Sequence, residues 1–126
     1  METLKQINEA SRIKFNEASE VSPILRAITQ QLGLELKSII LHGSVARGEA
    51  KYNSDTDLLL VFNTPIAFDT FLANYFFQIR ESLINNGYNP DKFDILPCSQ
   101  KSFDNPSQKN QPLLYHIIKE APWISI

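Results

Sequence analysis

The sequence predicts an α/β (α+β) fold in which helices flank a small mixed sheet. Apolar runs too short to be helices alternate with stretches that carry apolar residues at helical spacing. The expected strands are 34–41, 58–62 and 93–96, and the expected helices are 1–19, 22–33, 64–87 and 113–120. An order of helix, strand, loop, strand, helix, strand, helix is typical of this fold class.

The length of the chain limits the number of domains that it can form. A chain of 126 residues has enough material for one hydrophobic core. We therefore expect a single domain over residues 1–126. It divides into N-terminal helices (1–33), a central sheet and helix that hold the candidate site residues (34–97), and a C-terminal loop and helix (98–126).

Local signals define the expected helix ends. Ser22 and Pro23 suit the N-cap and first position of a new helix, and Gly33 is a typical residue after a helix end. The clearest helical pattern runs from Phe68 to Leu83 with apolar residues at i, i+3, i+4 and i+7. After a loop at 105–111, Pro112 starts the last expected helix over Leu113–Glu120.

The expected strands differ in how they are bounded. Residues 34–41 lead into a turn at Gly43, and residues 58–62 are apolar on both faces, which favours a strand covered on both sides. Residues 93–96 lie between Pro90 and Pro97, which we expect to set the limits of that strand.

Composition excludes several classes of protein. The formal net charge is −2, so no global positive field exists to attract nucleic acid, and nucleic acid is disfavoured as a partner. A single cysteine, Cys98, rules out an internal disulfide and suits a reducing compartment. No apolar stretch approaches the roughly 20 residues of a membrane helix, and the first residues lack a signal-peptide pattern. We expect a cytoplasmic protein with no membrane partner.

Two carboxylates mark the strongest candidate site. Asp55 and Asp57 stand two residues apart at the head of the apolar run 58–62, so on a strand both side chains leave on one face. Like charges this close are unfavourable unless a proton or a cation relieves them. Hard oxygen ligands of this kind suit Mg²⁺, which completes its coordination with water and substrate phosphates.

A candidate phosphate site lies just upstream. Glycine at position 43 lets the backbone turn at the end of the first strand and lets a ligand approach. The N–H groups of the turn and the Ser44 hydroxyl can hold phosphate oxygens, above all if residues 44–47 begin a short helix. Arg47 and Lys51 add positive charge nearby.

These residues give the sequence its family resemblance. Gly43-Ser44, a spacer of about ten residues, and Asp55-Thr56-Asp57 together resemble the signature of the DNA polymerase β-like nucleotidyltransferase superfamily. The form GSVARG…SDTDLLLVF is especially similar to the minimal nucleotidyltransferases, small proteins often encoded beside a partner of the HEPN type. The resemblance implies the polymerase β-like fold. It also implies a third carboxylate on a neighbouring strand, for which Asp94 is the match.

The resemblance implies a specific chemistry. Asp55, Asp57 and Asp94 would bind Mg²⁺, two ions when nucleotide is present, and a nucleoside monophosphate would pass to an acceptor hydroxyl with loss of pyrophosphate. The favoured reaction moves AMP from ATP to a tyrosine of a partner HEPN-type toxin, which would make the chain an antitoxin.

Two alternatives and several points stay open. The chain could transfer nucleotide to a small molecule, like the aminoglycoside nucleotidyltransferases, or it could be a non-catalytic module that neutralises its partner by occlusion. The small size favours an acceptor surface taken from a partner or from a second copy, so a homo-oligomer is also open. The base of the nucleotide is not fixed by the sequence.

Residues near the signature have simpler expected roles. His42 borders the glycine turn and could face the triphosphate, but we expect it to be buried and satisfied by the backbone. We expect Tyr52 to lie exposed in a loop and Cys98 to be an inert thiol. The apolar end, residues 121–126, indicates either a docked tail or an interface.

Overall fold

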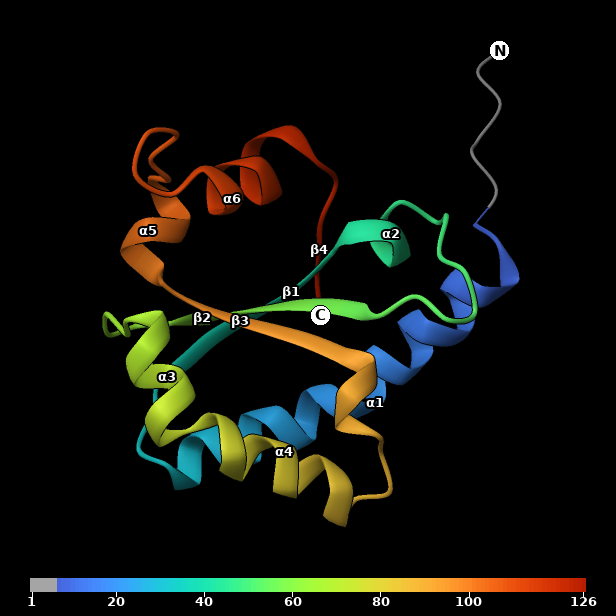
Figure 1. Ribbon diagram of the computed structural model, residues 1–126, viewed down its shortest axis with the longest axis horizontal. Helices are drawn as coiled ribbons and strands as arrows, with labels where there is room; N and C mark the ends of the chain where they lie inside the picture. Colours follow the sequence, from blue (N-terminus) through green and yellow to red (C-terminus); the bar gives the residue numbers. More distant parts are fainter. Residues whose placement is uncertain (1–6) are drawn as a thin grey trace.

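A four-stranded mixed sheet forms the centre of the protein (Figure 1). The structure is a computed structural model that describes residues 7–126. Its strands are β1 (Leu36–His42), β2 (Thr56–Phe62), β3 (Phe93–Ser99) and β4 (Ile124–Ser125). They lie in the order β3-β2-β1-β4, with β2 parallel to β3 and β1 antiparallel to both β2 and β4. This confirms the predicted mixed sheet.

Helices cover both faces of this sheet. They are α1 (Glu9–Gln31), α2 (Gly43–Ala46), α3 (Phe68–Asn74), α4 (Phe76–Asn85), α5 (Gln100–Asp104) and α6 (Pro112–Tyr115), with a 3-10 turn η1 (Pro90–Lys92) and a π-helical turn η2 (His116–Glu120). In Figure 1, α1, α3 and α4 lie below the strands, while α5 and α6 lie above them. The sheet is thus the middle layer of three.

Strand β2 shows how the two faces are filled. Its alternate residues Leu58, Leu60 and Phe62 belong to the larger core cluster, which includes Phe71 of α3 and Leu83 of α4. The intervening residues belong to a second cluster with the C-terminal segment; these are Leu59 and Val61 on β2, packed with Leu114 and Ile117. The prediction that this strand is covered on both sides is confirmed.

The N-terminal region differs from the prediction. A single helix, α1, replaces the two expected helices, and Ser22 is a buried residue within it instead of an N-cap. Pro23 lies inside the helix, where it removes one backbone donor, but the buried stripe of Ala18, Val21 and Leu25 continues across it against the sheet. Tertiary packing therefore outweighs the local break signal. The part of the expected helix at residues 1–6 lies outside the described residues.

The expected helix at 64–87 is also different. It begins at Phe68 and is broken at Tyr75 into α3 and α4, because Tyr75 leaves helical geometry with φ of −128°. Phe71, Ile79 and Leu83 are fully buried as the pattern predicts. Phe68 and Leu72 are instead exposed.

Strand β3 runs through Pro97 to Ser99, so Pro97 does not end it as predicted. Within the described part of the chain, the strand is at the edge of the sheet and pairs with β2 alone. Proline is tolerated at an edge because the missing N–H is not needed by a second neighbour.

The C-terminal region is more structured than expected. The predicted helix over Leu113–Glu120 consists of α6 followed by the π-helical turn η2, and a further short helix, α5, follows β3. The apolar end is a docked tail, since β4 pairs with β1 through Leu41 opposite Ile124. Its last residue is held by a backbone bond from Ile126 to Ile39. Among residues 7–126, no helix has the length and apolar character needed to cross a membrane.

Helix α1 holds the loop between β1 and β2 through buried polar contacts. The Asn8 side chain caps α1 by accepting from the N–H of Ser11, and it donates to the carbonyl of Ala50. The buried Ser11 hydroxyl accepts from the Ala50 N–H at 2.8 Å. These bonds anchor the loop that connects the two halves of the candidate site.

Replacing Ser11 with alanine should therefore destabilise the fold. Ser11→Ala leaves the buried Ala50 N–H without its acceptor, which costs about 1–3 kcal/mol in the free energy of unfolding. Urea denaturation measures this loss, and hydrogen exchange of the Ala50 amide should become faster. Ser19→Ala, an exposed position on the same helix, is the matched control and should change stability by less than about 0.5 kcal/mol. Equal effects of the two substitutions would contradict this role.

Candidate active site

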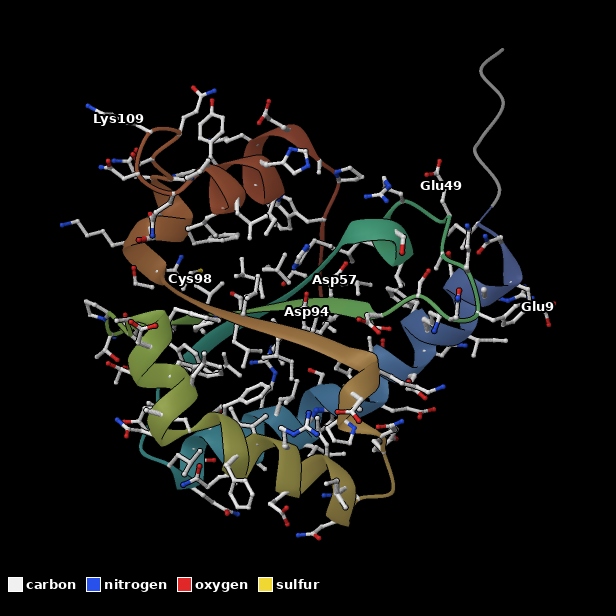
Figure 2. All side chains as sticks on the ribbon, in the orientation of Figure 1. Glu9, Glu49, Asp57, Asp94, Cys98 and Lys109 are labelled. Atoms are coloured by element: carbon white, nitrogen blue, oxygen red, sulfur yellow. The ribbon has the colours of Figure 1, made fainter. Side chains whose placement is uncertain are left out.

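Three polar side chains lie in a row across the central strands. In the strand register, His42 of β1 is opposite Asp57 of β2, and Asp57 is opposite Asp94 of β3. Residues directly opposite each other on neighbouring strands project from the same face. That face is the one covered by the C-terminal segment, because Leu59, two residues after Asp57, packs there. Figure 2 shows Asp57 and Asp94 close together over the strands.

Gly43 brings the start of α2 against Asp57. Its φ of +74° is in the left-handed region that favours glycine. A Cβ at this position would lie 3.0 Å from the Asp57 carboxyl carbon and would overlap its Oδ2 atom. Glycine is therefore required here both for its conformation and for its lack of a side chain.

A cavity of about 220 Å³ lies above the row of polar residues. Its walls are His42, Gly43, Arg47, Asp57, Asp94 and Leu96 from the sheet side, and Leu113, His116, Ile117 and Ala121 from the C-terminal segment. Donor groups from the β1–α2 connection and carboxylates from β2 and β3 therefore meet in one space.

Of the other predicted site residues, Arg47 lines the cavity, whereas Asp55, Ser44 and Lys51 do not. Asp55 precedes β2 and is exposed, but it is near enough to raise the pKa of Asp57. Ser44 is half-buried in α2, and Lys51 is exposed in the loop. Arg47 lines the cavity with a side chain 43% exposed, and its Nε lies 3.5 Å from Glu49 Oε2.

The electrostatics of the site centre on Asp57. Burial, together with the neighbouring carboxylates Asp94 and Asp55, raises the pKa of Asp57 to about 6, while Arg47 acts in the opposite direction. A bound cation would relieve the same repulsion. Among residues 7–126, no group of three or more His, Cys, Asp and Glu side chains is clustered closely enough to form a metal site on its own.

The donor set nevertheless fits a hard cation that also binds substrate. The row supplies two carboxylates in register, with a third beside them, and Mg²⁺ typically takes only one or two carboxylates and completes its coordination with phosphates and water. An all-protein cage is not needed for such an ion.

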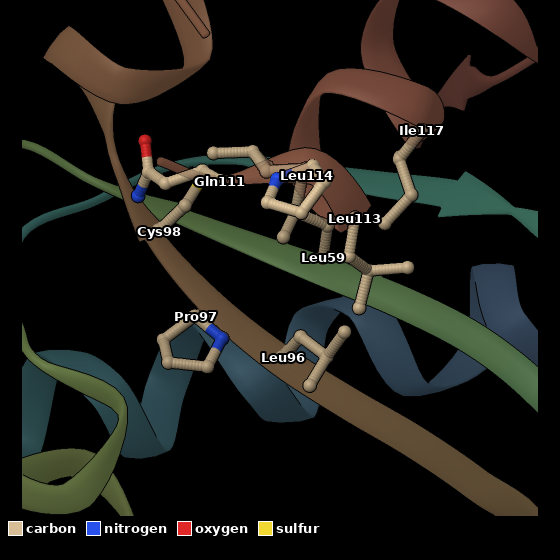
Figure 3. Close-up of a pocket in the computed structure, with 9 residues that line it drawn as sticks. Leu59, Leu96, Pro97, Cys98, Gln111, Leu113, Leu114 and Ile117 are labelled. Carbon is tan, nitrogen blue, oxygen red and sulfur yellow. The ribbon is translucent and has the colours of Figure 1, made fainter. Parts of the chain in front are cut away.

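A second, apolar cavity adjoins the polar one, and Figure 3 shows residues that line it. It has a volume of about 240 Å³ and lies between β2, β3 and the C-terminal segment, and it shares Leu96, Leu113 and Ile117 with the polar cavity. Cys98 lies in its wall, and burial raises the pKa of this thiol to about 12. The thiol therefore stays protonated, in agreement with the prediction that it is inert.

The structure adds site residues that the sequence did not identify. His42 is buried as predicted, but the prediction that it is satisfied is wrong, because within the described chain its Nε2 has no hydrogen-bond partner. Its spacing of two residues from Ile40 could have placed it on this face. The C-terminal wall, with His116 and Ile117, had no sequence signal, since only tertiary structure brings it over the sheet. Tyr52 is exposed as expected, and its hydroxyl donates to Glu9.

Comparison with known proteins identifies the class. The chain belongs to the nucleotidyltransferase domain family, which it matches over residues 22–119. Its structure is similar to that of a Sulfolobus solfataricus protein described as "a putative nucleotidyltransferase", with 18% identity, a TM-score of 0.47, and coverage of 81% of this chain and 84% of that one. No functionally curated protein has a significantly similar sequence.

Family membership agrees with the fold and the site. The four-stranded mixed sheet with its helices is consistent with the polymerase β-like nucleotidyltransferase fold. The matched range includes Gly43, Ser44, Asp55, Asp57 and Asp94. Membership supports nucleotidyl transfer as the general activity and a transferase as the enzyme class.

The contact between Gly43 and Asp57 gives a stability prediction. Gly43→Ala adds left-handed backbone strain and a Cβ that overlaps the Asp57 carboxylate, so we expect a loss of about 2–4 kcal/mol in unfolding free energy. Gly33→Ala is the matched control, because its φ is +76° and nothing lies within 4 Å of the added carbon. It should lose only the backbone part, about 1 kcal/mol. A loss at Gly43 no larger than that at Gly33 would disprove the close contact.

The raised pKa of Asp57 gives a pH prediction for metal-free protein. Because folded Asp57 holds its proton up to about pH 6, whereas an unperturbed aspartate has a pKa of 3.8, wild-type stability falls as pH rises between those values. Asp57→Asn removes this group, so the variant should gain about 1 kcal/mol over wild type by pH 7, with solvent screening limiting the gain. Thermal unfolding in EDTA from pH 4 to 7 measures the difference. A difference that does not change with pH would contradict the raised pKa.

Proposed function

We propose that this chain is a Mg²⁺-dependent nucleotidyltransferase that moves AMP from ATP to a tyrosine hydroxyl of a partner HEPN-type toxin, and so acts as an antitoxin. The observation that carries the proposal is the placement of Asp57 and Asp94 in register on one sheet face, directly beside the Gly43 turn. Carboxylates for a cation and N–H groups for phosphates thus border the same cavity.

The carboxylates would hold the cation. Asp57 and Asp94 would bind Mg²⁺ from the cavity wall and Asp55 from its exposed rim, with two ions when nucleotide is present. Bound Mg²⁺ supplies charge neutralisation for the phosphates and a lowered pKa for the acceptor hydroxyl. The raised pKa of Asp57 in the free protein supports this assignment, because a cation stabilises its ionised form.

The β1–α2 connection would position the triphosphate. The first N–H groups of a helical turn have no partners within that turn, and here they follow Gly43, which adds no side chain of its own. Arg47 adds a guanidinium at the exposed side of the cavity, with Ser44 and Lys51 near it in the chain. These groups would hold the phosphate oxygens while the carboxylates hold the cation.

Nucleotidyl transfer then depends on the orientation of the acceptor hydroxyl and the triphosphate, and it needs no covalent enzyme intermediate. The acceptor oxygen attacks the α-phosphorus in line, the bond to the bridging oxygen of pyrophosphate breaks, and the hydroxyl proton passes to solvent. The Cys98 thiol has no part in this because it is buried and protonated.

Support for a protein acceptor comes from the resemblance to minimal nucleotidyltransferases and from the shape of the site. Asp55, Asp94 and Arg47 are exposed, so the rim of the cavity opens to solvent on the side where the charged groups lie. A tyrosine carried on a protein surface could reach the α-phosphorus at this rim.

The test is transfer from α-³²P-ATP with Mg²⁺ in lysate of the source cell and with a purified HEPN-type toxin. Wild type should label one protein band. Asp57→Asn and Asp94→Asn should reduce the label about a hundredfold or more, because each removes a charge that stabilises the transition state. EDTA should have the same effect, and Asp69→Asn, an exposed carboxylate on α3, is the matched control that keeps activity.

The outcomes separate the alternatives. Label on a small molecule would overturn the protein acceptor and favour a small-molecule enzyme. Absence of label with any nucleoside triphosphate would overturn the transfer activity and favour neutralisation by occlusion. Full labelling by Asp57→Asn would refute the role of this carboxylate.

A further inference from the structure

His42 is a buried polar residue with an unused hydrogen-bonding atom. Its side chain is 8% exposed, and within the described chain Nε2 is shielded from solvent and has no hydrogen-bond partner. Buried polar atoms of native proteins nearly always have partners, and an unpartnered one lowers stability. A phenylalanine would fill much the same space without this disadvantage, so packing alone does not explain an imidazole here.

The position of the imidazole ring indicates which ligand would supply a hydrogen-bond partner for Nε2. His42 lies at the end of β1, directly before Gly43, and it lines the polar cavity together with Arg47. On this side of the cavity the groups are hydrogen-bond donors, whereas Asp57 and Asp94 form the acidic side. A ligand that contacts both sides of the cavity must therefore place a cation beside the carboxylates and anionic oxygens beside the donors.

An imidazole suits a donor role beside these carboxylates. His42 lies directly opposite Asp57 in the strand register. A lysine or arginine at this position would form an ion pair with Asp57 and occupy a carboxylate needed for the cation. An imidazole N–H can bind a phosphate oxygen without placing a permanent positive charge beside that carboxylate.

We propose that His42 is a binding residue for the nucleoside triphosphate, in which the Nε2–H donates a hydrogen bond to a phosphate oxygen. This inference rests on the proposed function and assigns a role to a residue outside the glycine-serine and aspartate signature. Because Nε2 is shielded in the free protein, binding requires the imidazole to rotate about its Cβ–Cγ bond toward the cavity.

The test uses two substitutions with opposite predictions. His42→Phe keeps a ring of similar shape without a donor, whereas His42→Gln keeps an N–H near the position of Nε2. Calorimetry with Mg²⁺ and the non-hydrolysable analogue α,β-methylene-ATP should show binding at least tenfold weaker for His42→Phe, as expected for a hydrogen bond to a charged group. For His42→Gln, binding should stay within about threefold of wild type.

Stability separates this role from a structural one. Without ligand, His42→Phe should melt at the same temperature as wild type or higher, because it removes an unsatisfied buried atom. In ¹⁵N spectra of wild type, Nε2 of His42 should carry the proton and shift on nucleotide binding. His116→Gln assigns the signals, since the chain has 2 histidines.

Each result bears on the inference. If wild type binds the analogue and His42→Phe binds it equally well, the inference is wrong while the proposed function stands. If wild type does not bind, both fail. If His42→Phe unfolds, an unchanged Nε2 signal in wild type saturated with nucleotide would overturn the inference, and a shifted, protonated Nε2 would support it.

Discussion

The close approach of Gly43 to Asp57 is the constraint on which the site depends. It requires β1 and β2 to be antiparallel with His42 opposite Asp57, because a shift of one residue would turn Asp57 toward the opposite core. That register is specified by the two hydrophobic faces of β2, where Leu58 and Leu59 pack into separate clusters. The packing that stabilises the sheet therefore also places the Asp57 carboxylate against the Gly43 turn.

The parallel pairing of β2 with β3 completes the acidic side. Asp94 comes opposite Asp57 because η1 and α4 return the chain to the same end of the sheet, so the carboxylates start their strands together. The loop between β1 and β2 is fixed from below by Ser11 and Asn8 of α1. Elements far from the cavity thus set the distances within it.

The C-terminal segment turns an exposed sheet face into a cavity. Its tail pairs with β1 through β4, and the Trp123 side chain packs edge-on against Phe103 of α5 and donates to the carbonyl of Ile118. Between these anchors, Leu113 and Ile117 lie over the sheet and contribute to both the polar and the apolar cavity. The result is two adjoining cavities, one lined by charged residues and one apolar, with Leu96, Leu113 and Ile117 in the walls of both.

Much of this architecture could be predicted from the sequence, and the failures have physical causes. Strands β1, β2 and β3, the mixed sheet and the glycine turn followed from short apolar runs and from Gly43 itself, whereas β4 was not predicted. Pro23 and Pro97 misled the prediction, because a proline acts as a break signal only where the lost N–H is needed, and helix packing or an edge position removes that need. The local pattern that contains Gly43 and Asp57 indicated the segment that borders the cavity, while the roles of these residues stay predictions. The wall formed by residues 113–121 depends on tertiary contacts of the last strand, which no local pattern encodes.

The free site is unfavourable in two ways that one ligand would relieve. Within residues 7–126, Asp57 has a raised pKa and the buried Nε2 of His42 has no hydrogen-bond partner. Each feature opposes the stability of the empty protein, and both residues line the same cavity. A ligand that binds only the folded state adds RT ln(1 + [L]/Kd), about 2.7 kcal/mol at a hundred times Kd, which is of the same size as such penalties. A Mg²⁺–nucleotide complex has the required charges, with a cation for the carboxylates and oxygens for the donors. The polarity of the cavity is thus best understood as complementary to a ligand that carries both signs of charge.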